Sequence, residues 1–187
     1  MLRCAFVANR LSLPAHVVLL SLVLLGCGNS ATPDAGAPTD VPAFEASVDA
    51  GALLEPGTGQ LQWEPLQPSG NRLELIHGPQ GGYHVFGRVR YRQLGPDVYL
   101  SFRVTPTEGG GALNDANARI RLREGRGLVR VGADTWETSS AQLVILDAIR
   151  GPQEVVGRRF RLEFTVQRFE APETASAAVE IEIVDES

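Results

Sequence analysis

Residues 159–167 read RFRLEFTVQ, and they are among the clearest alternating runs in the sequence. Every second residue from Phe160 to Val166 is a large apolar one, and charged or polar residues stand between them. Side chains of a β-strand point alternately to its two faces, so the pattern predicts a strand with one buried face and one wet face. The same alternation recurs in residues 83–92, 97–105, 118–123 and 177–184.

Weaker strand candidates lie between these runs, in residues 60–64, 73–77, 127–131 and 142–146. The last of them is apolar on both parities, and we expect it to be the most buried. Segments rich in Gly and Pro separate the runs, and no stretch has a convincing helical period. The pattern predicts an all-β fold, an antiparallel β-sandwich of about 8 to 9 strands. We expect an immunoglobulin-like or fibronectin-like architecture, although the Cys, Trp, Cys spacing of true immunoglobulin domains is missing.

The chain begins with a different kind of sequence. Arg3 and Arg10 precede an apolar run over residues 11–25, and Gly26 stands between the last leucine of this run and Cys27. A basic start, an apolar stretch and a small residue at its end are the layout of a secretory signal. The alternative is an uncleaved transmembrane helix, which needs about 20 apolar residues. This run is shorter and contains Pro14.

The four residues that end at Cys27 resemble the lipobox of bacterial lipoproteins. In that family the cysteine thiol is joined to a diacylglycerol, and the peptide before it is removed. The resemblance implies that Cys27 is lipidated and that the lipid anchors the protein to a membrane of the bacterial cell envelope. Gly28 follows instead of aspartate, and by the same resemblance this favours the outer membrane.

Three segments follow from these patterns. Residues 1–26 are predicted to be the lipoprotein signal peptide, residues 27–59 the lipidated cysteine with a disordered linker, and residues 60–187 the β-sandwich domain. The linker is expected because residues 28–59 are rich in Ala, Pro, Gly and Thr and contain acids but no arginine. Such a sequence cannot bury enough apolar surface to offset the entropy of ordering.

Composition excludes several classes of protein. The formal net charge is -5, whereas a nucleic-acid-binding protein is expected to show a basic excess. The chain has two cysteines, and Cys4 lies in the predicted signal peptide, so no disulfide is expected in the exported protein. A Gly-x-Ser-x-Gly elbow, a His-Glu-x-x-His motif and a phosphate loop are all missing from the sequence. We therefore expect a protein that is not an enzyme and needs no cofactor.

Residues 77–84, HGPQGGYH, form the most distinctive local sequence. They are similar to a segment of uncharacterised all-β bacterial lipoproteins, and that resemblance implies no activity. The two imidazoles of His77 and His84 suggest a metal site. However, a five-residue hairpin loop would pair His77 with Tyr83 and His84 with Ile76, which places the two rings on opposite faces. Only a shift of one residue in register would bring them together.

A second candidate site lies in the loop over residues 106–117. Asn114, Asp115 and Asn117 offer oxygen atoms at nearby positions, as calcium loops do, but the glycine and glutamate of the EF-hand pattern are not in place. Asn and Asp are also common turn residues, and we favour a turn.

A third candidate is the series of alternate arginines on the predicted wet faces. These could bind an anionic polymer or pair with glutamates across the strands.

Three functional hypotheses remain. The favoured one is a membrane-anchored envelope lipoprotein whose β-sandwich is a non-catalytic binding or structural module that contacts an envelope protein or a cell-wall glycan. The second is a metal-binding envelope protein that uses His77 and His84. The third is a small glycan hydrolase, which requires a cleft with two carboxylates within about 10 Å of each other.

Overall fold

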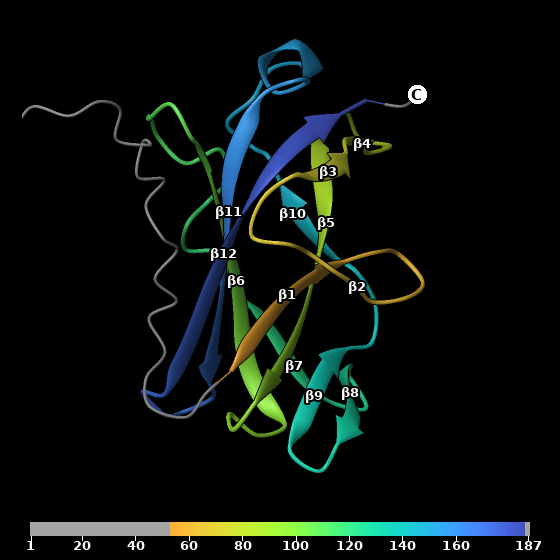
Figure 1. Cartoon of the computed structure of the whole chain (residues 1–187), viewed down its shortest axis with the longest axis vertical. Helices are drawn as coiled ribbons and strands as arrows, with labels where there is room; N and C mark the ends of the chain where they lie inside the picture. Colours follow the sequence, from red (N-terminus) through yellow and green to blue (C-terminus); the bar gives the residue numbers. More distant parts are fainter. Residues whose placement is uncertain (1–52, 186–187) are drawn as a thin grey trace, which may run out of the picture. The chain divides into compact units, whose positions relative to one another are not determined.

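The computed structural model describes residues 53–185, and this part of the chain is all-β, as the alternation predicts (Figure 1). The predictions for the signal peptide, for Cys27 and for most of the linker lie outside the described residues. One short 3-10 helix, η1 (Pro152–Glu154), precedes β11. The strands are β1 (Leu54–Thr58), β2 (Glu64–Pro65), β3 (Asn71–Glu74), β4 (Ile76–His77), β5 (Tyr83–Arg92), β6 (Asp97–Pro106), β7 (Ile120–Glu124), β8 (Gly127–Gly132), β9 (Thr135–Thr138), β10 (Gln142–Ile145), β11 (Arg159–Arg168) and β12 (Thr174–Val184).

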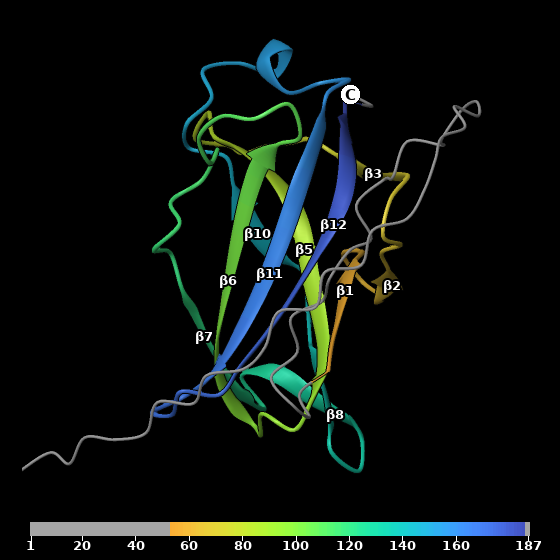
Figure 2. The same ribbon diagram turned by 60° about the vertical axis from the view of Figure 1, so that its left-hand side comes forward.

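The strands form two facing layers of a β-sandwich. One layer has the order β7-β6-β11-β12-β3, and the other is built around β5, which pairs with β1 and β4 along one edge and with β9 and β10 along the other. Figure 2 shows β6, β11 and β12 running side by side, with β5 and β10 behind them. A short parallel contact between β7 and β8 joins the layers.

The core lies between the layers and is made by the alternation that the sequence displays. In β11, Phe160, Leu162, Phe164 and Val166 are buried at every second position. The layers approach closely where β5 crosses β6, because Gly87 has no side chain and the ring of Phe102 fills the space beside it. A methyl group on residue 87 would lie 2.7 Å from a ring carbon of Phe102. The glycine therefore sets the position of this ring.

The sheet includes residues that lie before the predicted boundary at residue 60. Residues 54–58, which we assigned to the linker, form β1 and pair with β5 and β2. The composition of these residues is that of a linker, but their backbone groups pair with β2 and β5, which come later in the sequence. Gly57 also lies against the indole of Trp63, so that a side chain at residue 57 would collide with the ring.

The structure describes twelve strands where we expected about 8 to 9, and the additional ones are short. The expected strand over residues 73–77 is divided into β3 and β4, and β9 was not predicted. Most pairings are antiparallel, as expected, but β3 runs parallel to β12 and closes the edge of its layer. The parallel pair joins strands from opposite ends of the domain, which a local pattern does not reveal.

The expectation that residues 142–146 are the most buried is wrong. Val144 and Leu146 are buried, but Leu143 and Ile145 are 47% and 56% exposed. The reason is that β10 lies at an edge of its layer, where only one of its two apolar faces meets the core.

Among residues 53–185 there is no helix with the length and hydropathy that a membrane span requires.

Candidate binding groove beside strand β10

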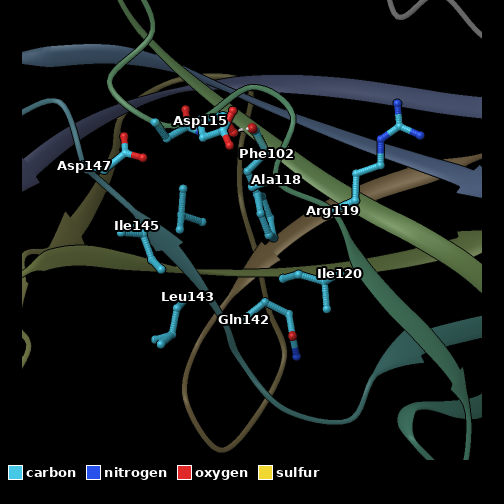
Figure 3. Close-up of a pocket in the computed structure, with 11 residues that line it drawn as sticks. Phe102, Asp115, Ala118, Arg119, Ile120, Gln142, Leu143, Ile145 and Asp147 are labelled. Atoms are coloured by element: carbon cyan, nitrogen blue, oxygen red, sulfur yellow. Dashed lines mark hydrogen bonds between the residues drawn. The ribbon is translucent and has the colours of Figure 1, made fainter.

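A pocket of about 490 Å³ opens between β10 in one layer and the segment before β7 in the other. Figure 3 shows the side chains of Leu143 and Ile145 from β10 along one side of it, with Phe102 and Ile120 across from them. We call this pocket, together with the open edge of β10, the β10 groove. Apolar side chains form most of its lining. Part of the hydrophobic core is therefore accessible from solvent at the groove.

The floor of the groove is Phe102 of β6. This ring packs edge-on against Phe164, with 5.4 Å between the ring centroids. Its edge also fills the space where a side chain of residue 87 would lie. Phe102 is 7% exposed, and what remains accessible faces the pocket. The core therefore extends to the groove without a polar layer over it.

The wall opposite β10 is held by Asn114. Its side-chain oxygen accepts a hydrogen bond of 2.8 Å from the backbone N–H of Val104, and its amide nitrogen donates one of 2.8 Å to the backbone oxygen of Phe102. The backbone of Leu113 also donates to the oxygen of Val104. The asparagine amide thus satisfies backbone groups of β6 that a neighbouring strand would otherwise bond, and this edge stays free of a further strand.

Charged and polar groups lie at the rim. Asp115 and Asp147 are exposed and lie at the same end of the groove, where the backbone of Ala148 donates a hydrogen bond to Leu113 (Figure 3). Arg119 turns its guanidinium away from the apolar lining and toward Gln167, at 3.5 Å. This is an apolar groove with a polar rim, which is the usual design of a site that binds by burying surface.

The candidate calcium loop lies in the wall of this groove. Asn114 uses its side-chain oxygen and nitrogen on β6, and Asp115 accepts a hydrogen bond of 2.9 Å from the backbone N–H of Asn117. The Asp115 contact is a common turn arrangement. Asn114 therefore uses its side-chain oxygen on β6 and Asp115 uses one of its oxygens within the loop, so the pattern in the sequence belongs to a structural loop that shapes the groove.

His77 and His84 lie at the hairpin that the sequence suggests. The register pairs His77 with Tyr83 and Ile76 with His84, so the two rings lie on opposite faces. His77 packs edge-on against Tyr83, and its Nε2 lies 3.3 Å from Oδ2 of Asp185. Burial lowers the pKa of His84. This arrangement does not support an ion shared by the two imidazoles, and residues 53–185 contain no cluster of three His, Cys, Asp or Glu side chains suited to a metal.

Arg88 and Arg90 of β5 do not belong to the solvated series that we considered, whereas Arg92, in the same strand, is half exposed. Arg88 is 3% exposed and bonds to Glu137 through Nη2 at 3.0 Å, although its position in the strand faces away from the core between the layers. Arg90 bonds to the other oxygen of Glu137 at 2.8 Å and stacks on Trp63, with 3.8 Å between its Cζ and the ring centroid. We call Arg88, Arg90 and Glu137 the buried charge cluster. Because both guanidinium groups bond to the Glu137 carboxylate, part of their positive charge is neutralised and less of it remains to attract an anionic ligand.

Sequence reasoning missed the groove, although one signal was present. Residues 142–146 are apolar on both parities, and we interpreted this as burial on both faces. The same pattern is also that of an edge strand with an apolar outer face, and only the pairing of β10 decides between the two.

No protein-family profile matches this chain, and no curated protein matches it by sequence. Among solved structures, it is similar to the CooA pilin subunit from enterotoxigenic Escherichia coli. The match covers 71% of this chain and 99% of that one, with 8% sequence identity and a TM-score of 0.35. A likeness this distant carries no argument about function.

Proposed function

We propose that this protein is a lipid-anchored protein of the bacterial cell envelope, and that its β-sandwich is a non-catalytic binding module that uses the β10 groove. The observation that carries the proposal is the open apolar edge of β10 beside the pocket over Phe102. An exposed edge strand offers unpaired backbone groups to an extended ligand, and an adjoining apolar pocket accepts its side chains.

The energetics favour a role for this surface in binding. Leu143 and Ile145 leave about half of each side chain in water. Full burial of such a side chain contributes about 1.5–3 kcal/mol, so a ligand that covered both would gain on the order of 2 kcal/mol from these two residues alone. An exposed edge with an apolar face is otherwise a liability for aggregation, which natural proteins usually blunt with charge or proline.

A comparison of two double variants tests the proposal. In the first, Leu143→Arg and Ile145→Arg place charges at the groove. In the second, Val129→Arg and Val131→Arg make the same change on β8, where the valines are 41% and 48% exposed. We expect the wild-type protein, solubilised from membranes, to retain an envelope protein or cell-wall polymer, and only the groove variant to lose it. If the wild type retains nothing, or if both variants lose the ligand equally, the groove is not the binding site.

The anchor has a separate test. The lipobox resemblance leads us to expect that Cys27→Ser prevents lipid attachment and impairs processing of the signal peptide. A single acyl chain binds membranes only marginally, whereas two or more hold a protein firmly. The wild type should therefore remain in the outer-membrane fraction after washing with high salt, and mass spectrometry should detect the lipid on Cys27. An intact, unmodified amino terminus on the native protein would contradict this part of the proposal.

A second candidate function is glycan hydrolysis, favoured by the two carboxylates, Asp115 and Asp147, at one end of the groove. Such chemistry needs an acid and a base on either side of the scissile bond. It predicts release of reducing ends from cell-wall glycan, and loss of that release in both Asp115→Asn and Asp147→Asn. Binding without turnover would leave the non-catalytic function as the better account.

A further inference from the structure

We propose that the β10 groove accepts residues 43–48 of a second copy of this chain as an added β-strand. This inference rests on the proposed function and names the partner as another molecule of the same protein. Four observations carry it: the direction of the free backbone groups of β10, the apolar surface beside them, the sequence of residues 43–48, and the length of chain between that segment and β1.

The backbone of β10 has one bonded side and one open side. Leu146 donates a hydrogen bond of 2.8 Å to the oxygen of Tyr83, and β10 pairs with β5 in the same antiparallel register. Bonding alternates along an antiparallel pair, so Gln142 and Val144 also direct their backbone groups toward β5. The N–H and C=O groups of Leu143 and Ile145 then point the other way, where no strand within residues 53–185 pairs with β10.

A strand added at this edge would cover two kinds of apolar surface. One set of its side chains would lie beside Leu143 and Ile145 on the outer face of the layer. The alternate set would enter the pocket over Phe102, next to Val144. The pocket side is lined by the buried Phe102 and Val144, whereas Leu143 and Ile145 on the outer face are half in water, so the ligand that fits is an extended peptide with apolar residues at every second position, directed to the pocket.

The expected linker contains one stretch with this pattern. Residues 43–48 read AFEASV, in which Phe44, Ala46 and Val48 share one parity while Glu45 and Ser47 share the other. Phe44 is the one aromatic residue between Gly28 and β1 in the sequence. With the apolar parity toward the pocket, the two polar residues would lie on the outer face in contact with water.

The length of the chain assigns this segment to a second molecule. The backbone of Leu53 bonds to Arg92 at the β1 edge of β5, whereas β10 lies on the opposite edge, where Gln142 is level with Gly87. An added strand would lie about 17 Å along β5 and three strand spacings, or about 14 Å, across from Leu53, a separation of about 22 Å. The five residues from Val48 to Leu53 span at most about 18 Å. A molecule therefore cannot place Val48 beside its own β10.

The contact would join two different surfaces, the linker of one copy and the groove of the next. Such a heterologous contact produces rings when its rotation closes and open assemblies when it does not. The lipid anchors would hold neighbouring copies in one membrane plane, which raises the local concentration of linkers around each groove. A segment of modest affinity could then occupy the groove without a large interface.

Disulfide trapping between two differently tagged copies tests the inference in native membranes. One copy carries Glu45→Cys or Ser47→Cys, and the other carries Leu143→Cys or Ile145→Cys. Side chains on the same face of adjacent strands bring their Cβ atoms about 4.5–5.5 Å apart, within reach of a disulfide after a small adjustment. We expect oxidation to link the two tags in at least one of these four combinations, and adding Phe44→Asp to the first copy should reduce the yield several-fold.

Two matched controls decide what a linked product means. Ala46→Cys carries its thiol on the parity that faces the pocket, and Val131→Cys is an exposed apolar position on β8. We expect both to give several-fold less product, since a strand in register presents only one parity to Leu143. Equal products from residues 45, 46 and 47, or from Val131→Cys, would mean random collisions and would overturn the inference.

The same experiment separates this inference from the proposed function. If no tags are linked, but the groove variant still loses an envelope protein or polymer that the wild type retains, the groove binds a different partner and only the present inference fails. If the tags are linked as expected and the retained protein is a second copy of this chain, both stand.

Discussion

Replacing Glu137 should destabilise this domain far more than replacing either arginine that it bonds. The Glu137 carboxylate receives a hydrogen bond of 3.0 Å from Arg88 on one oxygen, and bonds of 2.8 and 3.2 Å from Arg90 on the other. Its side chain is 11% exposed and that of Arg88 is 3% exposed. In Glu137→Gln the shape is kept, but one buried guanidinium loses the charge that compensates it.

The expected loss is about 3–5 kcal/mol, which is typical when one partner of a buried ion pair is removed. A domain of this length has about 7–20 kcal/mol of stability in total. The unfolding temperature should therefore fall by more than about 10 °C. Urea unfolding followed by the fluorescence of Trp136, which lies next to Glu137 in β9, measures the change.

Arg88→Met serves as the matched control. Nε and Nη1 of Arg88 have no hydrogen-bond partner among the described residues, so part of the cost of burying this guanidinium is not offset. Methionine fills much of the same space without a charge, and Glu137 keeps its bonds to Arg90. We expect Arg88→Met to cost less than half as much as Glu137→Gln, and the pair Arg88→Met with Glu137→Met to recover part of the loss. The reasoning is refuted if Glu137→Gln costs less than about 1 kcal/mol, as an exposed pair would, or if Arg88→Met is equally damaging.

Two further predictions concern the groove and the pH dependence of stability. Gly87→Ala should displace the ring of Phe102 toward the groove and destabilise the domain by about 1–3 kcal/mol, measured by urea unfolding, because a methyl group there would lie 2.7 Å from the ring; unchanged stability would show that the ring moves freely. The hydrogen bonds that Arg121 donates to Asp97, at 2.8 and 3.0 Å, lower the pKa of that carboxyl. A carboxyl whose pKa is lower in the folded protein stabilises the fold at pH values above its pKa in the unfolded chain, which is about 4. This stabilisation is lost as the pH falls through the pKa of the folded protein. Wild type should therefore be slightly more stable than Asp97→Asn at neutral pH, and the difference should disappear in acid; a difference that persists at pH 2 would contradict the assignment.

The outline of the fold could be predicted because its longest strands carry their own pattern. In β11 one parity is apolar and the other is polar, and the structure buries the apolar one. The hairpin at residues 77–84 was also predictable, including the pairing of His77 with Tyr83, since loop length sets the register. These features depend on residues that are close together in the chain.

The candidate site could be predicted only in part. Asn114 and Asp115 were singled out for their oxygens, but the structure uses Asn114 to bond the edge of β6. Leu143 and Ile145 were expected in the core, and they are exposed. In each case the role depends on which distant strand lies alongside, and a local pattern carries no information about that neighbour.

The period-2 alternation lies in consecutive residues, so the all-β class of this protein could be predicted without knowing which strands pair, while the resemblance of residues 24–27 to a lipobox stays a prediction. Three features appear only in the folded domain: residues 54–58 belong to the sheet, the Arg88 side chain is buried with Glu137, and β10 is an open edge beside a pocket. The physical reason is the same in all three cases. Burial and backbone pairing are set by contacts between segments far apart in the chain, so the same residues can be linker or strand, wet or buried, core or binding surface, according to what packs against them.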